Sequence, residues 1–499
     1  GAQAVPSRTR QRLAAVLQHL AASRLAACEG AHAECGTKVG PLKSHACGAV
    51  GSHDIEDLAG PGRPHSPRGS GDVKGSPRKK PDLFDPARFA ETQKPLLEAS
   101  TLPGECYNSP EWFEREMDRV FVPSWSLVGR EDEMTEPGSY LAIDTEWGGP
   151  VAVCRGNDGK LYAFANVCCH RGAKVVQGSM GKGTKMGLVC PYHAWTYNFD
   201  GTLKWAPGME MAENFEEKIR MRPVRVESFH GFVFVCVSDD APALRETLGD
   251  LPQRHAPWFG PEGKAQGMVC VGRREYTVDC NWKFLMENTC EPYHTATVHK
   301  GSLGPMKAVP EDPHTGEWDA VKIPTQRSVV PLPTDFEGEQ FPLPAFTDRT
   351  AFVNLFPSMQ INVTWDCLWW MRIFPLGVDR TQIVLGFCFP RETTQLDRFP
   401  SVLEKYRARW HIAVSEDNAI SQNQQRGNRS RFRRPGRFHP LEFGTHNFNN
   451  WVLSKMLDGG PRWDPGQRII MGDKAWSNDD KLLQKTIEEA EEALKHKVD

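Results

Sequence analysis

Cysteine and histidine occur in two matched pairs in the first half of the chain. Cys168 and His170 lie in a Cys-Cys-His segment, and Cys190 and His193 lie in a Cys-Pro-Tyr-His segment that follows it. Two thiolates on one iron and two imidazoles on the other are the ligands of one type of two-iron, two-sulfur cluster, which carries electrons. The pattern therefore predicts that these four side chains hold a [2Fe-2S] cluster.

A structural zinc site is the alternative for the same four side chains, because two cysteines and two histidines also form a tetrahedral zinc shell. Zinc fingers usually supply their ligands in the order Cys, Cys, His, His, whereas each segment here supplies one of each. Arg171-Gly172 after the first pair and Trp195 after the second also favour the cluster. We expect the remaining cysteine of the first segment, Cys169, to pack in the interior rather than to bind metal.

A second possible metal site lies further along the chain, in residues 287–300. It contains His294 and His299, five positions apart, with Pro292 shortly before them. A non-haem iron that activates oxygen takes two histidines and one carboxylate on one face and leaves its other positions open. Both imidazoles can reach one metal if the helix between them is irregular, although a histidine pair at this spacing is more often a surface or core feature. The pattern predicts a mononuclear Fe(II) site whose carboxylate comes from elsewhere.

Length and composition exclude several classes of protein. The chain has 499 residues, enough for two or three domains, and 25% of them are charged. A formal net charge of −3 gives no reason to expect nucleic acid as a partner. The most apolar runs are only of strand length, so no membrane span is expected. The 14 cysteines are scattered rather than arranged as a disulfide framework, which favours a soluble protein in a reducing compartment.

Residues 1–83 differ from the rest of the chain. They are rich in Ala, Arg, Gly, Pro and Ser, and residues 11–27 can form a short basic amphipathic helix. Such a segment is typical of a transit peptide for a plastid or mitochondrion. The alternative is a solvated, disordered extension of a cytoplasmic protein, because acidic residues such as Glu29 and Glu34 depart from the acid-poor pattern of transit peptides.

The next two regions have different patterns. Residues 84–124 are predicted to be the N-terminal helical part of the domain that residues 241–499 complete. Ser109 is expected as an N-cap in front of a proline at the first helical position. Residues 125–240 alternate short apolar runs with turn signals at Asp158-Gly159 and Asp200-Gly201. This alternation predicts an all-β domain whose loops hold the cluster.

Residues 241–499 mix helices and strands and are predicted to form the domain that holds the second metal. The segment with the histidine pair, residues 279–300, is predicted to be mainly helical and broken at its proline. Alternating apolar residues predict antiparallel sheet over residues 356–389, and helical periodicity predicts a long helix over residues 399–425. A charged amphipathic helix is predicted over residues 479–497.

Several further segments accompany the two ligand motifs, among them Asn281-Trp282-Lys283, Phe374-Pro375-Leu376-Gly377 and the block from Asn447 to Trp451. With these segments the chain resembles, over residues 102–459, the catalytic alpha subunits of Rieske non-haem iron oxygenases. That family includes ring-hydroxylating dioxygenases and the choline, betaine and carnitine monooxygenases. The resemblance implies an α+β fold: an all-β Rieske [2Fe-2S] domain, then a catalytic domain of antiparallel sheet plus helices (helix-grip, START-like), after a disordered N-terminal extension.

The resemblance also implies roles for three carboxylates. Asp417 is the implied third iron ligand, with its neighbour Glu416 as the alternative. Glu291 stands where the family has a catalytic carboxylate that contacts one iron-bound histidine and a cluster histidine of the adjacent subunit. A contact of this kind requires an oligomer, and the family forms head-to-tail homotrimers, which close into a ring.

The resemblance implies a terminal oxygenase that uses both metal groups to activate O2 and hydroxylate a small organic molecule. The chain shows no nicotinamide, flavin or plant-type ferredoxin motif, so electrons derived from NAD(P)H must arrive through a separate reductase or ferredoxin. Glu291 and the block ending at Trp451 favour a quaternary ammonium substrate such as choline, betaine or carnitine.

Alternatives remain for both the substrate and the class of protein. An aromatic ring-hydroxylating (di)oxygenase is the nearest one, and a non-catalytic Rieske electron carrier or metal-binding scaffold is one of a different class. An aromatic cage could hold a quaternary ammonium group by cation–π attraction, although core packing explains the same residues at least as well: Trp365, Trp369, Trp370, Phe352 and Phe356. Strand alternation places Trp370 on the opposite face from Trp365 and Trp369.

Overall fold

The structure is a computed structural model that describes residues 82–209, 212–213, 215, 218–260, 263–304, 306, 308–323, 341, 350–364, 366–460 and 463–464. The predicted N-terminal extension up to residue 81, the predicted helix 479–497 and Trp365 lie outside the described residues. Within the described part of the chain, each helix is too short or too polar to traverse a bilayer.

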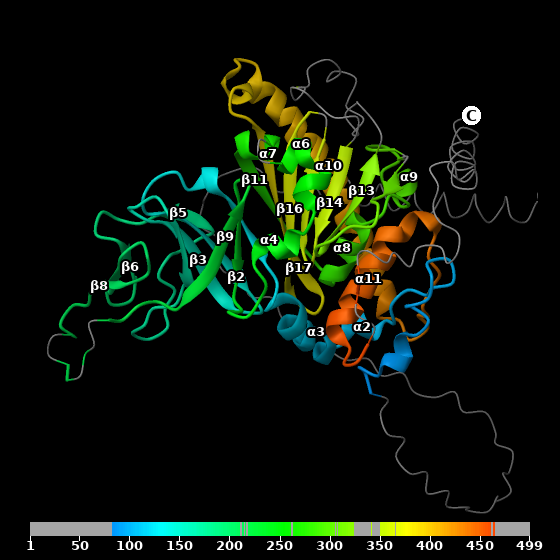
Figure 1. The fold of residues 1–499 in the computed structure, drawn as a ribbon, viewed down its shortest axis with the longest axis horizontal. Helices are drawn as coiled ribbons and strands as arrows, with labels where there is room; N and C mark the ends of the chain where they lie inside the picture. Colours follow the sequence, from blue (N-terminus) through cyan, green and yellow to red (C-terminus); the bar gives the residue numbers. More distant parts are fainter. Residues whose placement is uncertain are drawn as a thin grey trace, which may run out of the picture. The chain divides into compact units, whose positions relative to one another are not determined.

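Two antiparallel sheets form the part of the chain that was expected to be all-β (Figure 1). The larger has the strand order β1-β10-β9-β4-β3-β2-β5 and the smaller has the order β6-β7-β8. Gly159 lies between β3 and β4 and Gly201 lies between β7 and β8, both with positive φ, which costs glycine little; the two predicted hairpins are confirmed. The strands are β1 (Ser126–Arg130), β2 (Ser139–Thr145), β3 (Gly149–Arg155), β4 (Leu161–Ala165), β5 (Met180–Lys182), β6 (Leu188–Val189), β7 (Thr196–Tyr197), β8 (Leu203–Trp205), β9 (Pro223–Phe229) and β10 (Phe232–Cys236).

A third sheet, also antiparallel, follows after the short helices α4 (Leu244–Leu248), α5 (Leu251–Arg254), α6 (Ala256–Phe259) and α7 (Lys264–Gly267). Its strand order is β11-β17-β16-β15-β14-β13-β12. The predicted sheet over residues 356–389 is confirmed, because β15, β16 and β17 cover it. The strands are β11 (Met268–Val278), β12 (Val309–Pro310), β13 (Trp318–Ile323), β14 (Thr350–Leu355), β15 (Met359–Val363), β16 (Leu368–Gly377) and β17 (Arg380–Pro390).

Helices pack against this third sheet (Figure 1), namely α8 (Trp282–Thr289), α10 (Phe399–Asn428) and α11 (Phe443–Met456). The ring of Trp410 in α10 stacks on Phe387 of β17 at 4.5 Å, and Trp451 of α11 lies 5.1 Å from Phe356. These buried aromatic contacts hold α10 against β17 and α11 against the turn between β14 and β15. The predicted long helix is confirmed and runs three residues further, to Asn428. Together with the β domain, this sheet and its helices confirm the predicted α+β fold.

Short helices precede the β domain: η2 (Pro86–Phe89), α2 (Glu105–Asn108), α3 (Pro110–Glu116) and η3 (Met117–Phe121). The Ser109 hydroxyl accepts a hydrogen bond from the amide of Trp112 at 3.3 Å, which confirms the predicted N-cap. The buried Glu116 carboxylate accepts hydrogen bonds from Lys283 Nζ at 2.6 Å and from Trp282 Nε1 at 3.0 Å. A buried carboxylate needs such partners, so this network holds α3 against α8.

The β domain and the third sheet also contact each other directly. Arg130 of β1 is 1% exposed, and its guanidinium donates to the carbonyls of Ala265 at 3.0 Å and Met268 at 2.9 Å. Arg372 of β16 donates to the carbonyl of Val128 at 2.9 Å. The described residues thus all belong to one compact unit, which starts at residue 79. The domain boundaries 84–124, 125–240 and 241–499 stay predictions.

Candidate metal centres

The two loops predicted to hold the cluster have the same local backbone. The carbonyl of Cys168 accepts a hydrogen bond from the amide of Gly172 at 2.9 Å, and that of Cys190 accepts one from Ala194 at 3.1 Å. Gly172 and Ala194 both have positive φ, +77° and +58°. Each loop therefore turns back on itself within the four residues that follow its cysteine.

The four predicted cluster ligands come together as a pair of thiols and a pair of imidazoles. Cys168 and Cys190 are each 3% exposed, whereas His170 and His193 are exposed with their Nδ1 atoms 3.1 Å apart. The Tyr197 hydroxyl lies 3.2 Å from the sulfur of Cys168. Two buried sulfurs and two adjacent ring nitrogens at the surface fit a cluster whose histidine-bound iron faces solvent.

The spacing of these donors does not fit a single zinc ion. Tetrahedral zinc with bond lengths of about 2.0–2.3 Å brings its ligand atoms to within about 3.8 Å of one another. Among the described residues, the one group of three or more donors that lie within 4.8 Å of one another is His294, His299 and Asp417. The four cysteine and histidine donors are therefore spread more widely than one zinc ion would require.

Cys169 departs from its predicted role. Its side chain is exposed, so the expectation that it packs in the interior is wrong. Its amide donates to the Tyr197 hydroxyl at 2.9 Å, and the next residue, His170, stacks on Trp195 with ring centroids 5.0 Å apart. The backbone of Cys169 is thus held by the domain although the residue is exposed. Its sequence neighbour Cys168 is buried, so nothing in the sequence indicated this difference.

The segment with the histidine pair is interrupted as predicted. Helix α8 ends at Thr289, and the one-turn helix α9 (Thr295–Val298) begins after the carbonyl of Pro292 accepts a hydrogen bond from the amide of Thr295. His294 and His299 flank α9, with ring centroids 5.1 Å apart. The break lets both rings turn toward α10.

Asp417 on α10 lies opposite these two rings. Its Oδ1 is 3.0 Å from His299 Nε2 and 3.5 Å from His294 Nε2. This oxygen is buried and has no hydrogen-bond partner among the described residues, although nitrogen atoms lie so close to it. Three donors that converge without hydrogen bonding to each other suit a shared metal ion, and two imidazoles with one carboxylate are the donor set of non-haem iron.

Carboxylates also lie at the other nitrogen of each ring. Glu291 Oε1 accepts from His294 Nδ1 at 2.8 Å, and Glu416 Oε2 accepts from His299 Nδ1 at 2.8 Å. Burial lowers the pKa of each imidazole, but the surrounding carboxylates outweigh it and raise both above the usual histidine value. Glu416, the alternative ligand, thus contacts the Nδ1 edge of the His299 ring, whereas Asp417 lies at the Nε2 edge.

A cavity of ≈ 90 Å³ lies between the third sheet and α10 and reaches His294, His299 and Asp417. Trp369 and Phe352 line it. The other two described members of the proposed aromatic cage are buried in hydrophobic cores instead: Trp370 and Phe356. Four amide side chains also line the cavity and were not predicted from the sequence, because they come from separate elements and share no motif: Asn288, Gln360, Asn362 and Asn418.

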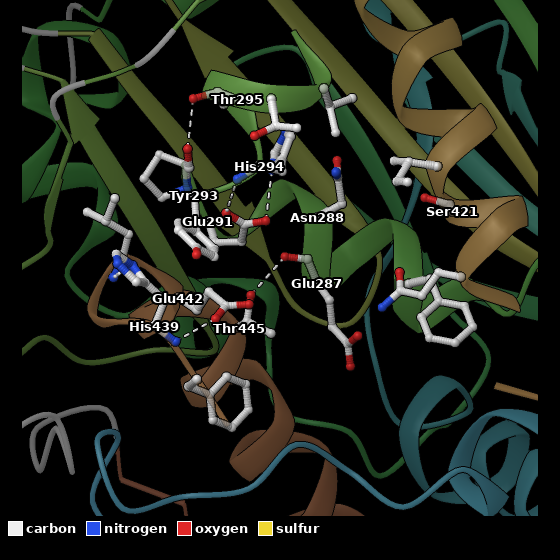
Figure 2. A pocket seen from close by; sticks show the side chains of 18 of the residues that line it. Glu287, Asn288, Glu291, Tyr293, His294, Thr295, Ser421, His439, Glu442 and Thr445 are labelled. Carbon is white, nitrogen blue, oxygen red and sulfur yellow. Dashed lines mark hydrogen bonds and ion pairs between the residues drawn. The ribbon is translucent and has the colours of Figure 1, made fainter. Parts of the chain in front are cut away.

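A second and larger pocket, of ≈ 710 Å³, shares Asn288, Glu291 and His294 with the first and also reaches α10 and α11 (Figure 2). Figure 2 shows Glu291 bonded to His294 within it, with Ser421 of α10 on the facing wall. Burial raises the pKa of Glu287, which accepts from the Tyr107 hydroxyl at 2.6 Å, to about 7. Burial likewise raises the pKa of Glu442 to about 7. Glu287 and Glu442 were not among the predicted functional residues.

Comparison with known protein families agrees with both halves of the described structure. The family model for the Rieske [2Fe-2S] domain matches residues 124–216. The model for the ring hydroxylating alpha subunit (catalytic domain) matches residues 266–458. The first match contains the two cluster loops, and the second contains the histidine pair and Asp417.

Similar proteins cover most of the chain. The glycine betaine monooxygenase oxygenase subunit of Chromohalobacter salexigens is 27% identical over 409 residues, which is 74% of this chain and 89% of that protein. The chloroplastic choline monooxygenase of Arabidopsis thaliana is 28% identical over 369 residues, 71% of this chain and 82% of that protein. A solved structure of a quaternary ammonium Rieske monooxygenase, reported with carnitine oxidation and inter-subunit electron transfer, is 26% identical, covers 75% of this chain and 99% of its own, and has a TM-score of 0.62.

Proposed function

The chain belongs to the alpha subunits of the Rieske oxygenases, and from this we propose that it hydroxylates a small quaternary ammonium compound such as choline, betaine or carnitine. The observation that carries the proposal is the convergence of His294, His299 and Asp417 at the end of a cavity with aromatic walls. An ammonium group with methyl substituents is attracted to ring faces and needs no hydrogen-bond partner, so Trp369 and Phe352 suit it.

We assign the site residues by their chemistry. Cys168, Cys190, His170 and His193 would hold the cluster, and His294, His299 and Asp417 would hold the mononuclear iron. When bound, the cluster supplies single electrons and the iron supplies the site of oxygen activation. The protein itself keeps Nε2 of both histidines turned toward Asp417 and excludes bulk water with the apolar walls of the cavity.

Glu291 has a proposed role between subunits. It already accepts from His294 Nδ1, and it lines the large pocket. A cluster histidine of a neighbouring chain that enters this pocket would meet the same carboxylate, which would orient both imidazoles. We therefore propose a homotrimer in which each cluster serves the iron of the next chain, fed by a separate reductase or ferredoxin. Support comes from the solved relative reported with inter-subunit electron transfer.

A second candidate substrate is an aromatic compound. The family model that matches the catalytic domain is that of ring-hydroxylating subunits, and the apolar walls of the cavity would accept a flat ring. The two candidates differ in charge, so screening both classes of compound can separate them.

A plastid or mitochondrial location is also a proposal, supported by the chloroplastic relative and tested by the import of a fluorescent fusion.

The deciding experiment measures substrate-dependent oxygen consumption and product by mass spectrometry, with a reductase supplied. Choline, betaine, carnitine and simple aromatics are compared at equal concentration. The proposal expects turnover with at least one quaternary ammonium compound and none with the aromatics, and the reverse would favour ring hydroxylation. A His294→Ala, His299→Ala double variant is the control, because an electron carrier or scaffold would keep its function with this change.

A further inference from the structure

We infer that Glu416 is a positioning residue that fixes the ring of His299 and presents its Nε2 to the metal. The inference rests on the proposed iron site, and it gives Glu416 a role distinct from that of the ligand Asp417. It concerns the orientation of one imidazole and not the supply of a metal ligand.

The hydrogen bonds around Glu416 determine which ring nitrogen of His299 carries a proton. Its Oε2 accepts from His299 Nδ1 at 2.8 Å and from the Ser302 hydroxyl at 2.5 Å. In this contact the carboxylate oxygen accepts a hydrogen bond from the ring, so the proton of the pair lies on Nδ1 of His299. The nitrogen left to offer its lone pair to a metal is then Nε2, which lies 3.0 Å from Asp417 Oδ1. That lone pair is directed to where the three donors converge.

The geometry of α10 makes this double contact possible. Glu416 and Asp417 are consecutive residues of one helix, so their side chains leave it about 100° apart. One imidazole ring placed beside the helix can therefore meet Glu416 at one edge and Asp417 at the other. His299 is 1% exposed, so water cannot replace a lost partner of its Nδ1 without a local opening.

Ser302 makes the arrangement more than a chance contact. It follows α9, and its amide donates to the carbonyl of His299 at 2.9 Å while its hydroxyl binds Glu416. The carboxylate is therefore held by the same turn that carries the histidine. Glu291 makes the corresponding contact with His294 Nδ1, but it also lines the open pocket, whereas Glu416 is already bound to two partners of its own chain.

The simpler reading is that Glu416 only ties α10 to the turn after α9. The two readings differ in what the metal experiences. A tie would change stability and leave the affinity of the folded site for metal unaltered. A positioning residue changes metal affinity in protein that is still folded, and the loss of such partners of metal-bound histidines costs about 10–100-fold in affinity or activity.

The test uses the full-length, cluster-containing protein after selective removal of the mononuclear iron. Co(II) is added as a spectroscopic probe, and its affinity and visible absorption are measured in wild type, Glu416→Ala, Glu416→Gln and Ser302→Ala. We expect a 10–100-fold weaker affinity for Glu416→Ala and a smaller loss for Glu416→Gln, whose amide oxygen still accepts from Nδ1. Glu404→Ala, an exposed glutamate of α10 paired with Arg407, is the matched control and should bind Co(II) like wild type.

The outcomes separate the inference from the proposed function. Wild type that binds no Co(II), or binds it equally after His299→Ala, would refute the iron site itself. If wild type binds Co(II) and both Glu416 variants bind it with the same affinity as wild type, only the role of Glu416 is refuted. If Glu416→Ala loses its cluster or unfolds, Glu416→Gln decides, because a positioning role requires its Co(II) absorption bands to shift.

Discussion

Two imidazoles and three carboxylates meet between α9 and α10, and each carboxylate faces a different edge of a ring. Asp417 lies at the Nε2 side of both histidines, Glu291 at Nδ1 of His294 and Glu416 at Nδ1 of His299. Because only the Asp417 oxygen lies where both Nε2 atoms point, we expect the three acidic residues to have separable roles. Substitutions at each of them should therefore produce different defects.

Removal of Asp417 should abolish the mononuclear site and spare the cluster. We expect Asp417→Ala to lower iron from about three to about two atoms per chain, with the cluster absorption intact and no hydroxylated product. Metal analysis, visible spectra and product assays on the same preparation check this. Asp312→Ala, at an exposed aspartate, is the control. Three irons in Asp417→Ala would contradict the assignment.

Glu287 should make stability depend on pH near neutrality. Burial raises its native pKa to about 7, against about 4.3 in an unfolded chain. The native state therefore keeps this proton where the unfolded state has lost it, and stability falls as pH rises from about 4.3 to 7, then levels off. We expect Glu287→Gln, which retains an acceptor for Tyr107, to gain about 1–3 kcal/mol relative to wild type between pH 5 and 8.

Urea denaturation of both proteins at intervals across this range measures the difference. A gap that does not change with pH would show that Glu287 titrates normally in the folded protein. Tyr107→Phe offers a further check, because it removes the hydrogen bond that the Glu287 carboxylate accepts and leaves the acid in place.

At the scale of elements, the two cluster loops differ at one equivalent position. Gly172 and Ala194 both adopt positive φ, and only glycine does so at little cost. A Cβ at Gly172 would meet no atom within 4 Å, so Gly172→Ala isolates the backbone term and should cost about 1–2 kcal/mol. Ala194→Gly should be neutral or stabilising. Thermal unfolding of cluster-loaded protein tests the pair, and equal losses for both would exclude this explanation.

Regular elements could be predicted from the sequence, because burial repeats along them. The long helix from Phe399, the strands β15 to β17 and the Asp-Gly hairpins follow periodicity and turn chemistry alone. The residues that we propose as metal ligands could be named from their types, spacing and family resemblance. The break before α9 was foreseeable from Pro292, which cannot donate the hydrogen bond that a continuous helix needs.

The remaining features depend on contacts distant in sequence. Which edge of His299 each of Glu416 and Asp417 would meet depends on the rotation of α10 about its axis. That rotation follows from packing such as Trp410 on Phe387. The exposure of Cys169 depends on how its loop turns. Trp369 and Trp370 lie on opposite faces of the sheet, as strand alternation predicts. Only the folded sheet shows that Trp369 is the one that faces the cavity.

At the scale of the whole molecule, Arg130 joins the β domain to the third sheet. It is almost fully buried and donates to carbonyls of both parts, including His230 and Met268. We expect Arg130→Ala to cost about 3–5 kcal/mol, because it removes the buried cation that pairs with Asp132 and its hydrogen bonds to buried carbonyls of both parts. Arg222→Ala, whose partner Asp239 is exposed, should change stability by less than about 0.5 kcal/mol. Urea denaturation compares the two.

The exposed position of the cluster histidines has a consequence for how the protein behaves in dilute solution. Among the described residues, no hydrogen bond or ring contact joins His170 or His193 to the histidines beside α9. If each cluster transfers its electron only to the iron of a neighbouring chain, the cluster of an isolated chain would be reduced by its donor but could not pass the electron on. Turnover per chain should then fall sharply on dilution, while the colour of the cluster and its reduction by the donor persist. Mass photometry and rate measurements on the same dilution series test this. Undiminished turnover by monomers would show that the electron crosses within one chain.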